Sequence, residues 1–351
     1  MRKFFLTLAA IAVVSCLAVS AAAQSKATFT KLKLPISAFF QNYALSADGN
    51  VMAVNLAGEM FRWVKGNGFT DLGPTDGSIG ISADGSAITS GILGSDGLID
   101  AGIWKASTGW VNLGHTAKGC NLDGSWGDGW ALNGDGSVVV GLAWYCPGAQ
   151  GFRWDAFNGM VGLSHPTGHS SRATAISADS STIVGFYEHP SFGNRRPVRW
   201  RGRKADLFAG KNANGEAIVV STDGSQIAGQ ADDATGFHAF YFTDATGVIS
   251  LGTVSGNDSD QSSAAGISDR GTVVGWSGDR FGGGIEAFFW NANSPKSKMR
   301  SMKKVLIALG AKIPANVTLT NALALSADGK TMAGTWQDTK GNFGGWMARI
   351  Q

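Results

Sequence analysis

Residues 129–163 read GWALNGDGSVVVGLAWYCPGAQGFRWDAFNGMVGL, and this stretch decides the fold. It contains four short apolar runs separated by turn residues: Gly129–Leu132, Ser137–Tyr145, Gly151–Trp154 and Met160–Leu163. The segment Asn133–Gly136 is typical of a tight turn, because Gly adopts positive φ and Asp hydrogen bonds to nearby backbone. Phe152 and Trp154 are two residues apart and therefore share one face of a strand. The stretch predicts four short antiparallel strands, which we call A, B, C and D.

This pattern recurs along the chain. The residue that ends the A-to-B turn has seven equivalents: Gly49, Gly85, Gly136, Ser180, Gly224, Gly271 and Gly329. Such spacing is typical of one repeated unit that buries its apolar faces only against its neighbours, and four antiparallel strands per unit predict propeller blades. We expect the strand-C aromatics to pack between blades: Trp63, Trp104, Trp154, Trp200, Phe242 and Trp290. The repeated aspartates are expected to hold the turns and not to form a catalytic array.

The ends of the repeat array predict how the ring closes. The seventh copy ends after its C strand, residues 345–350, and lacks a D strand. The segment Thr28–Pro35 is similar to the D strand of the third copy. We therefore predict that this N-terminal strand completes the last blade and removes the exposed sheet edges. The predicted fold class is all-β, a seven-bladed β-propeller in a single domain over residues 24–351.

The first residues predict export. Arg2 and Lys3, the apolar run Phe4–Val19 and the small residues Ala21–Ala23 form a signal peptide over residues 1–23. The alternative is a lipoprotein with a lipidated Cys16, but the apolar run continues past that residue. The later sequence has no run of about 20 apolar residues that could span a membrane. We expect a periplasmic or extracellular protein, or an outer-membrane lipoprotein in the alternative case.

The net charge and composition of the chain limit the classes of partner that it is expected to bind. Removing residues 1–23, which hold two cations and no acid, lowers the formal charge from +3 to +1. This near-neutral balance argues against a nucleic-acid partner. A hydrophobic content of 44% with 12 Trp favours a packed core over disorder, despite 50 Gly. We expect a monomer.

The repeats resemble those of the HAF-repeat extracellular proteins of bacteria. The matching segments include Ile81–Gly85, Phe152–Trp154, Gly247–Gly252 and the terminal unit Leu306–Gly329. The similarity covers residues 43–350, with Ser180 in place of Gly, Phe242 in place of Trp and a shorter turn at Asp269–Gly271. The resemblance implies a secreted or surface-associated repeat protein and supplies no catalytic residue.

Length variation falls in the B-to-C and D-to-A connections, which share the face of the ring called the top. Variable loops on a rigid scaffold normally carry binding. One of these connections, residues 294–321, includes a predicted short helix, Met302–Leu309. Cys120 and Cys146 belong to top connections of one blade, so a disulfide is plausible in an oxidising compartment; two free thiols are the alternative.

Unrepeated residues at the top are the candidate ligand contacts. Aromatic and arginine side chains suit sugar rings, carboxylates and protein surfaces: Trp126, Trp144, Tyr145, Tyr187, Arg195, Arg196, Trp276, Arg280 and Trp336. We predict a secreted, non-enzymatic propeller that recognises a glycan or a protein on its top face.

The alternative is a propeller hydrolase or lyase that acts on polysaccharide. It would use the top-face histidines His115, His165, His169 and His189 as weak catalytic candidates. No metal-ligand spacing accompanies them, so no metal and no cofactor is expected. The loop Asn257–Asp260 could hold a divalent cation but lacks the spacing of a calcium loop, which favours a solvated loop.

Overall fold

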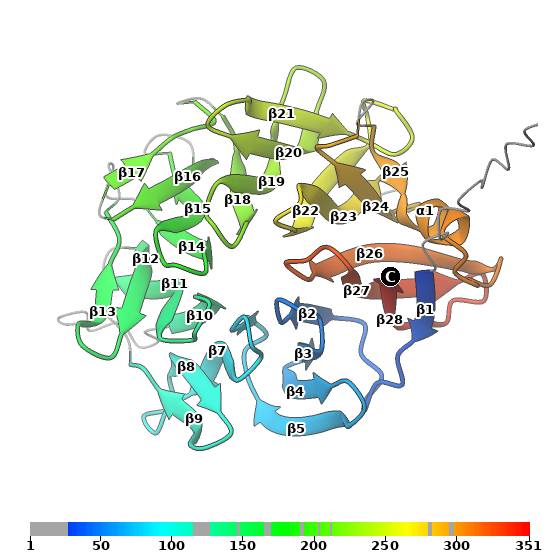
Figure 1. The fold of residues 1–351 in the computed structure, drawn as a ribbon. Coiled ribbons are helices and arrows are strands. Elements are labelled where there is room, and N and C mark those ends of the chain that lie inside the picture. Colours follow the sequence, from blue (N-terminus) through cyan, green and yellow to red (C-terminus); the bar gives the residue numbers. More distant parts are fainter. Residues whose placement is uncertain are drawn as a thin grey trace, which may run out of the picture.

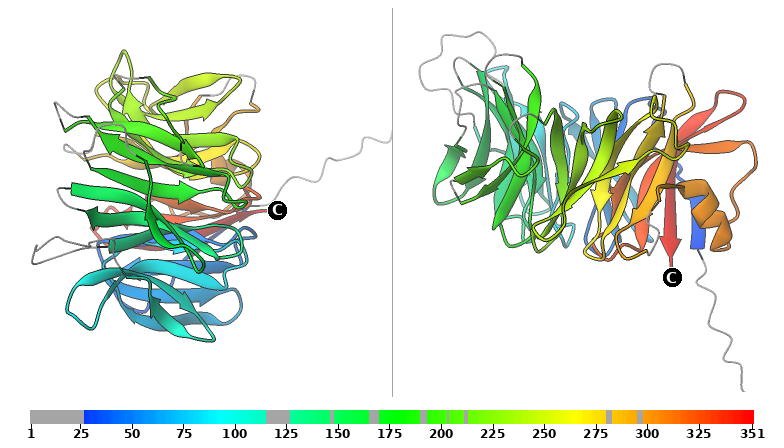
Figure 2. Two further views of the ribbon diagram at one scale, coloured as in Figure 1. Left: turned by 90° about the vertical axis from the view of Figure 1, so that its left-hand side faces the viewer. Right: turned by 90° about the horizontal axis from the view of Figure 1, so that it is seen from above.

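The computed structural model describes residues 27–114, 127–145, 148–164, 170–189, 193–202, 204–210, 213–279, 283–294 and 298–351. These residues form seven four-stranded antiparallel sheets arranged as a ring (Figure 1), so the prediction of a seven-bladed β-propeller is confirmed. In edge view the blades make a thick disc (Figure 2).

Six blades use consecutive strands in the order A, B, C, D. Blades 1 and 2 comprise β2 (Gln41–Leu45), β3 (Val51–Leu56), β4 (Glu59–Val64), β5 (Gly68–Pro74), β6 (Gly80–Ile81), β7 (Ala87–Leu93), β8 (Ile99–Lys105) and β9 (Gly109–Asn112). Blades 3 and 4 comprise β10 (Gly127–Leu132), β11 (Val138–Tyr145), β12 (Gly148–Asp155), β13 (Gly159–Gly162), β14 (Ser171–Ile176), β15 (Thr182–Glu188), β16 (Arg195–Arg201) and β17 (Lys204–Asp206). Blades 5 and 6 comprise β18 (Gly215–Val220), β19 (Gln226–Asp232), β20 (Phe237–Thr243), β21 (Gly247–Gly252), β22 (Gln261–Ile267), β23 (Thr272–Gly278), β24 (Glu286–Asn291) and β25 (Arg300–Ser301).

Blade 7 joins the two ends of the chain. It comprises β26 (Val317–Leu325), β27 (Thr331–Asp338), β28 (Phe343–Ile350) and, as its outer strand, β1 (Ala27–Lys31). The register runs from Ala27 opposite Ile350 to Lys31 opposite Trp346. The N-terminal strand therefore closes the ring, as predicted.

The apolar core is divided among the contacts between blades. The seven hydrophobic clusters each join two neighbouring blades. Trp200, for example, is 1% exposed among side chains of blades 3 and 4, and its Nε1 donates to the Ser164 carbonyl oxygen of blade 3 at 2.7 Å. The strand-C aromatics are thus blade-to-blade packing, as predicted.

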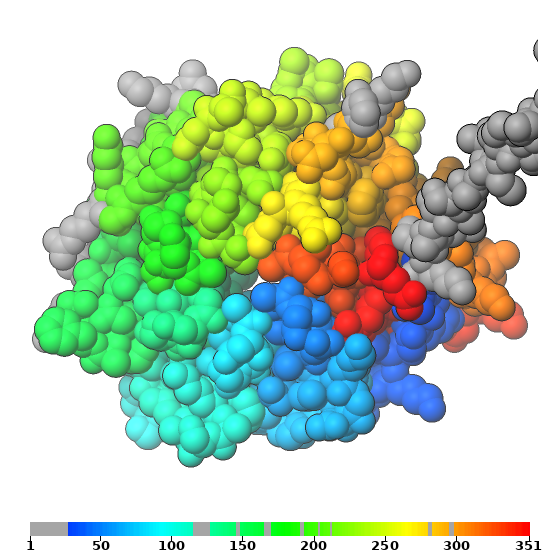
Figure 3. Space-filling model, in the orientation of Figure 1, coloured from blue at the N-terminus to red at the C-terminus, as the bar shows by residue number. Residues whose placement is uncertain are grey.

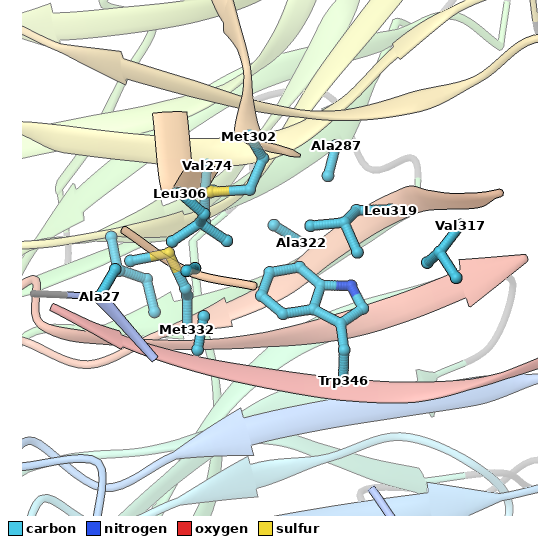
Figure 4. Packing of buried hydrophobic residues seen from close by; sticks show 13 residues of the cluster. Ala27, Val274, Ala287, Met302, Leu306, Val317, Leu319, Ala322, Met332 and Trp346 are labelled. Atoms are coloured by element: carbon cyan, nitrogen blue, oxygen red, sulfur yellow. The ribbon is translucent and has the colours of Figure 1, made fainter. Parts of the chain in front are cut away.

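The predicted helix exists as α1 (Met302–Ala308), but its expected place among the top loops is wrong. Its end lies beside the start of β1, because the Ala27 N–H donates to the Leu309 carbonyl oxygen at 2.8 Å. Met302 and Leu306 are buried near Trp346 in the cluster between blades 6 and 7 (Figure 4). The helix is therefore part of the core, because its apolar side seals the outer edge of that contact.

The A-to-B turns share one design on the bottom face, the face of these turns, which Figure 3 shows. In blade 1 the Ser46 hydroxyl donates to Asp48 Oδ1 at 2.8 Å and accepts the Val51 N–H at 3.0 Å. The turn glycine has positive φ, and a Cβ on Gly85 would lie 2.4 Å from Val51 of the preceding blade. At Gly85, both the turn and the contact between blades therefore favour glycine.

A belt of hydrogen bonds joins these turns around the ring. In blades 1 to 4, the residue that follows the turn serine or its equivalent donates its N–H to the carbonyl oxygen of the corresponding residue in the next blade. The residues linked in this order are Ala47, Ala83, Gly134, Ala178 and Thr222. At blade 6, where the turn is shorter, Asp269 Oδ1 replaces the carbonyl and accepts the Thr222 N–H at 2.9 Å. Asp269 then donates its own N–H to the Ala327 carbonyl oxygen at 2.9 Å. The Asp269 side chain therefore keeps the belt of hydrogen bonds continuous at the blade where the turn departs from the repeat.

Candidate functional site

The central channel is lined by the A strands. Each blade contributes one branched aliphatic residue to a ring near the bottom face: Leu45, Ile81, Leu132, Ile176, Val220, Ile267 and Leu325. The space that they and the residues above them line has a volume of about 320 Å³. Because most of the side chains that line this part of the channel are apolar, they offer few groups for chemistry.

The A strands become polar toward the top face. Four positions before the aliphatic ring residue the chain carries Gln41, Gly77, Asp128, Arg172, Glu216, Ser263 and Asn321. In blades 3 to 7 the A strand bulges near this position. The carbonyl there points at the strand-B glycine, so a Cβ on Gly141 would lie 1.8 Å from the Asp128 oxygen. The backbone is therefore fixed by the repeat while the side chain is free to differ from blade to blade.

A pocket of about 640 Å³ opens on the top face beside these polar positions, and we call it the top pocket. Its lining comes from blades 1 to 4: Phe40, Asn42, Asn55, Ala57, Gly58, Asp76, Gly77, Ser78, Asp128, Trp130, Leu142, Trp144 and Arg172. The set combines aromatic rings, amides and three charged groups, a composition typical of ligand sites.

Two carboxyl groups of the top pocket lie together. Asp76 Oδ1 accepts the Ser78 N–H and the Gly91 N–H, each at 3.0 Å, and the Ser78 hydroxyl at 2.9 Å. Burial raises the pKa of Asp76, but hydrogen bonds from Asp128, Ser78 and Gly91 outweigh it and leave the pKa below its usual value. Asp76 and Asp128 meet over Gly91, where a Cβ would lie within 2.7 Å of both carboxyl groups. The two carboxyl groups therefore lie close together at one end of the top pocket.

A second charged group on the top face, the Glu216 carboxylate, is paired with two arginines. Arg172 forms an ion pair with Glu216 Oε1, and Arg195 reaches Glu216 Oε2 at 3.1 Å. The Arg172 guanidinium stacks on Trp130, 4.0 Å from the ring centroid. Glu216 is only 6% exposed, so this network is a rigid wall between blades 3, 4 and 5. The Nε1 of Trp130 is buried without a hydrogen-bond partner in the described part of the chain, and such groups are commonly satisfied by a ligand or an ordered water.

Exposed aromatic side chains adjoin the top pocket where β1 leads into β2. Phe39 and Phe40 are 74% and 78% exposed, and Ile36 and Phe343 are also exposed. Phe39 lies edge-on to Phe40 and to Phe343, with ring centroids 5.6 and 5.7 Å apart. We call these four residues the aromatic patch. Because Phe40 also lines the top pocket, patch and pocket form one continuous surface.

The structure places the predicted ligand-contact residues at several separate positions, and only some of them lie at the top pocket. Trp144 lines the top pocket, and Arg195 belongs to the Glu216 network. Tyr187 is only 2% exposed and packs between blades 3 and 4, so its ring is not accessible to a ligand. Arg196 lies over the Tyr187 ring at 5.9 Å.

Two other predicted contacts lie elsewhere on the top face. Trp336 donates to the Gly345 carbonyl oxygen at 3.0 Å and carries the Lys31 ammonium 3.3 Å above its ring. Trp276 is half-buried in β23 of blade 6. Neither residue lines the top pocket.

Several predicted site residues lie outside the described residues: Trp126, Arg280, His115, His165, His169, Cys16, Cys120 and Cys146; the side chain of Tyr145 is also not described. Among the candidate histidines only His189 is described, and it follows β15. His238 is a core residue, since its Nδ1 lies 2.8 Å from Asp233 Oδ2 and its side chain is buried. The predicted disulfide and histidine cluster therefore stay predictions.

The loop Asn257–Asp260 holds one of its own carboxylates in a hydrogen bond. Asp260 Oδ2 accepts the Ser255 hydroxyl at 2.6 Å, so this carboxylate is engaged within its own loop. The described segments contain no group of three or more potential metal-ligating His, Cys, Asp or Glu side chains. Within the same segments, no helix has the length and apolar character needed to cross a membrane.

Comparisons with known proteins show the fold alone. The β-propeller domain of the Trilobed protease from Pyrococcus furiosus, described as having an open velcro topology, has a TM-score of 0.59 at 11% identity, with 93% of this chain and 97% of that chain covered. Hydrazine synthase from Kuenenia stuttgartiensis has a TM-score of 0.54 at 15% identity, covering 90% and 96%. Oligogalacturonate lyase from Vibrio parahaemolyticus has a TM-score of 0.53 at 11% identity, covering 93% and 97%. No protein-family model and no curated protein sequence matches the chain.

Proposed function

We propose that the protein is a secreted, non-enzymatic propeller that binds a glycan or protein ligand in the top pocket. The observation that carries this proposal is the pocket of about 640 Å³, lined by residues that the repeat does not require. The repeated turn serines and aspartates hydrogen bond to each other, and the strand-C aromatics pack between blades. Trp144, Asp76 and Asp128, in contrast, differ from their equivalents in other blades. Such a division between scaffold and variable residues is typical of a binding surface on a rigid fold.

The test is binding to arrays of oligosaccharides and peptides. We expect the wild type to bind members of one array, and Trp144→Ala and Phe40→Ala each to weaken that binding by about tenfold, as loss of an aromatic anchor does. The matched control is Phe157→Ala, because Phe157 is 95% exposed but lies in the C-to-D turn of blade 3, on the bottom face. Binding that survives both top-face changes, or that Phe157→Ala abolishes, would place the ligand elsewhere.

The alternative function, a polysaccharide hydrolase or lyase, gains one specific observation. The Asp76 and Asp128 carboxyl groups lie together in one pocket, and general acid–base catalysis commonly uses two such carboxyl groups. Incubation of the wild type and Asp128→Asn with oligosaccharides separates the two functions. Products that form with the wild type and not with the variant would favour the enzyme.

The remaining proposals concern family and location. The HAF-repeat resemblance, the signal peptide over residues 1–23 and the single exported domain over residues 24–351 are supported by the residues quoted above. Cell fractionation together with N-terminal sequencing tests them. A mature protein that begins near Gln24 outside the cytoplasm agrees with export, whereas a lipidated Cys16 at the N-terminus would indicate the lipoprotein.

A further inference from the structure

The cations of the chain are concentrated in one segment. Residues 287–327 contain no acidic residue and six cationic ones: Lys296, Lys298, Arg300, Lys303, Lys304 and Lys312. Residues 24–351 have a formal charge of +1, so with this segment set apart the remainder carries −5. The segment includes β25 and α1, which lie on the outer side of blade 6 (Figure 1). Clustered charges of one sign attract ligands of the opposite sign.

A pocket of about 380 Å³ lies within this cationic segment, and we call it the rim pocket. It is formed where β25 and the first turns of α1 meet Val254, which follows the outer strand of blade 5. Its lining has two cationic side chains and, among the described residues, no acidic one: Val254, Met299, Arg300, Ser301, Lys304, Val305 and Ala308. The adjoining pocket shares Val254 and Met299, and it is lined by both Asp258 and Lys298.

The two cations of the rim pocket keep their charge. Arg300 lies over the Phe289 ring, 5.3 Å from its centroid, and such a contact orients a guanidinium without neutralising it. Lys304 is exposed. Within the described residues, neither side chain forms an ion pair. Lys303, in contrast, donates to two backbone carbonyl oxygens and therefore belongs to the fold.

Ser301 is a second, independent sign of a ligand. Its side chain lines the rim pocket and is only 5% exposed. Its hydroxyl does not cap α1 and has no other hydrogen-bond partner in the described part of the chain. Buried polar groups are normally hydrogen bonded, so a buried hydroxyl that faces a pocket calls for an acceptor there. Beside two cations, that acceptor is best an anionic oxygen.

The number of charges and donors selects the kind of anion. A phosphate monoester carries between one and two negative charges near neutral pH and has three acceptor oxygens. It can therefore match two cations and a hydroxyl at once, whereas a carboxylate has one charge and two oxygens. The apolar side chains of Val254, Met299 and Val305 line the same pocket and suit a carbon-containing body attached to the phosphate.

We infer that the rim pocket binds a phosphate monoester carried on an apolar body. Arg300 and Lys304 bind its anionic oxygens, Ser301 donates a hydrogen bond to one of them, and the apolar lining contacts the body. This site is separate from the top pocket, so the inference goes beyond the proposed function. A soluble organic phosphate and the phosphate headgroup of a lipid share this chemistry.

Titration calorimetry of the whole protein with hexyl phosphate, hexanoate and inorganic phosphate tests the chemistry. We expect hexyl phosphate to bind, and hexanoate to bind at least about tenfold more weakly because it has fewer charges and acceptors. Inorganic phosphate should bind more weakly than hexyl phosphate because it lacks the apolar body. Hexyl phosphate should bind more tightly at about pH 7.5 than at about pH 5.5, since the second pKa of a phosphate monoester is about 6.

Vesicles separate the two sources of the phosphate. The protein is sedimented with phosphatidylcholine vesicles that contain or lack phosphatidic acid. Sedimentation that needs phosphatidic acid and is prevented by hexyl phosphate would support the inference and identify a lipid headgroup. Binding of hexyl phosphate without such sedimentation would support it and identify a soluble organic phosphate.

Substitutions locate the site. Arg300→Met and Lys304→Met should each weaken hexyl phosphate binding by about tenfold, because each removes a charge-assisted hydrogen bond. Ser301→Ala should weaken it by up to about tenfold and leave the urea midpoint unchanged, since the hydroxyl has no bond within the fold to lose. The matched control is Lys312→Met, which removes an exposed cation of the same segment that does not line the rim pocket, and it should bind like the wild type.

Circular dichroism verifies that each variant is folded. The inference would be overturned by equal binding of hexyl phosphate and hexanoate, by equal losses in Lys304→Met and Lys312→Met, or by absence of binding to hexyl phosphate and to both kinds of vesicle. Single-stranded DNA that binds more tightly than hexyl phosphate would also overturn it, because a polyanion would then be the better ligand. None of these outcomes affects the array test of the top pocket.

Discussion

The bottom and top faces of this ring differ in how they use the repeat. On the bottom face most blades have the same serine–aspartate turn, and a belt of backbone hydrogen bonds passes through these turns. On the top face the equivalent A-strand position carries Asp128, Arg172 and Glu216 in three successive blades. The difference teaches that repeated residues stabilise the ring, while departures from the repeat form the site. Three measurements can break or sharpen this division.

The largest effect should come from removing a repeated aromatic. Trp200→Ala deletes a fully buried ring between blades 3 and 4 together with its hydrogen bond to Ser164. We expect the free energy of unfolding to fall by about 3–5 kcal/mol, as for other buried tryptophans. Urea unfolding measures it. Trp144→Ala, in the half-buried wall of the top pocket, should cost less than about 1 kcal/mol while weakening ligand binding. If Trp200→Ala and Trp144→Ala lowered the free energy of unfolding equally, the distinction between scaffold and site residues would be wrong.

A smaller effect should appear in acid. Hydrogen bonds from the turn backbone and serine hydroxyls hold the pKa of Asp48, Asp84, Asp135, Asp179 and Asp223 below its usual value of about 3.8. Because the folded-state pKa is depressed, the stabilisation is present above the unfolded-state pKa and is lost as pH falls through the folded-state pKa. We therefore expect the urea midpoint to decline progressively below about pH 4.

Two variants check the source of the acid effect. Asp84→Asn keeps an acceptor in the turn but cannot titrate, so its midpoint should be lower at pH 7 and should fall less in acid. Asp258→Asn, at an exposed loop position, should follow the wild type. A wild-type midpoint that is constant from pH 7 to pH 2 would contradict the role given to the turn carboxylates.

The smallest effect is expected at the one turn that departs from glycine. Ser180 has a φ of 65° and accepts a hydrogen bond from Asn133 Nδ2 at 3.0 Å. Ser180→Gly relieves backbone strain and loses that hydrogen bond, and the two terms are of similar size. We expect a net change below about 1 kcal/mol in urea unfolding. Ser180→Ala keeps the strain and loses the bond, so it should be the more damaging change, and the reverse order would show that strain is negligible here.

The fold was predictable because its signals are local and repeated. The turn at Asn133–Gly136 and the spacing of Phe152 and Trp154 predict strands without reference to the rest of the chain, and seven copies identify the ring. The closing strand was predictable because Thr28–Pro35 resembles the D strands. The position of α1 was not predictable, because its apolar residues suit a helix that holds a top loop in place as well as one that packs into the core. The hydrogen bond between Ala27 and Leu309 fixes the helix beside the start of β1.

The candidate site was predicted only in part. Trp144 and Arg195 were selected because they are unrepeated and lie near hairpins. Asp76, Asp128 and Arg172 were missed, since each belongs to a different blade and only the closed ring brings them to one pocket. One signal was available. Aligning the copies on the aliphatic ring residue places charged groups at one position of three successive A strands, where the other blades have Gln, Gly, Ser or Asn.

The pairing of β1 with β28 also gives the molecule an orientation. Ala27 lies opposite Ile350, and the Ile350 N–H donates to the carbonyl oxygen of Lys330 in a bottom-face turn at 2.8 Å. Both ends of the described chain therefore leave the disc on the side away from the top pocket, as the C-terminus shows in Figure 2. A lipid anchor, a fused domain or an affinity tag attached at either end would face the disc's underside. Immobilised through such a tag, the protein would present its top pocket to solution, ready for a partner arriving from outside.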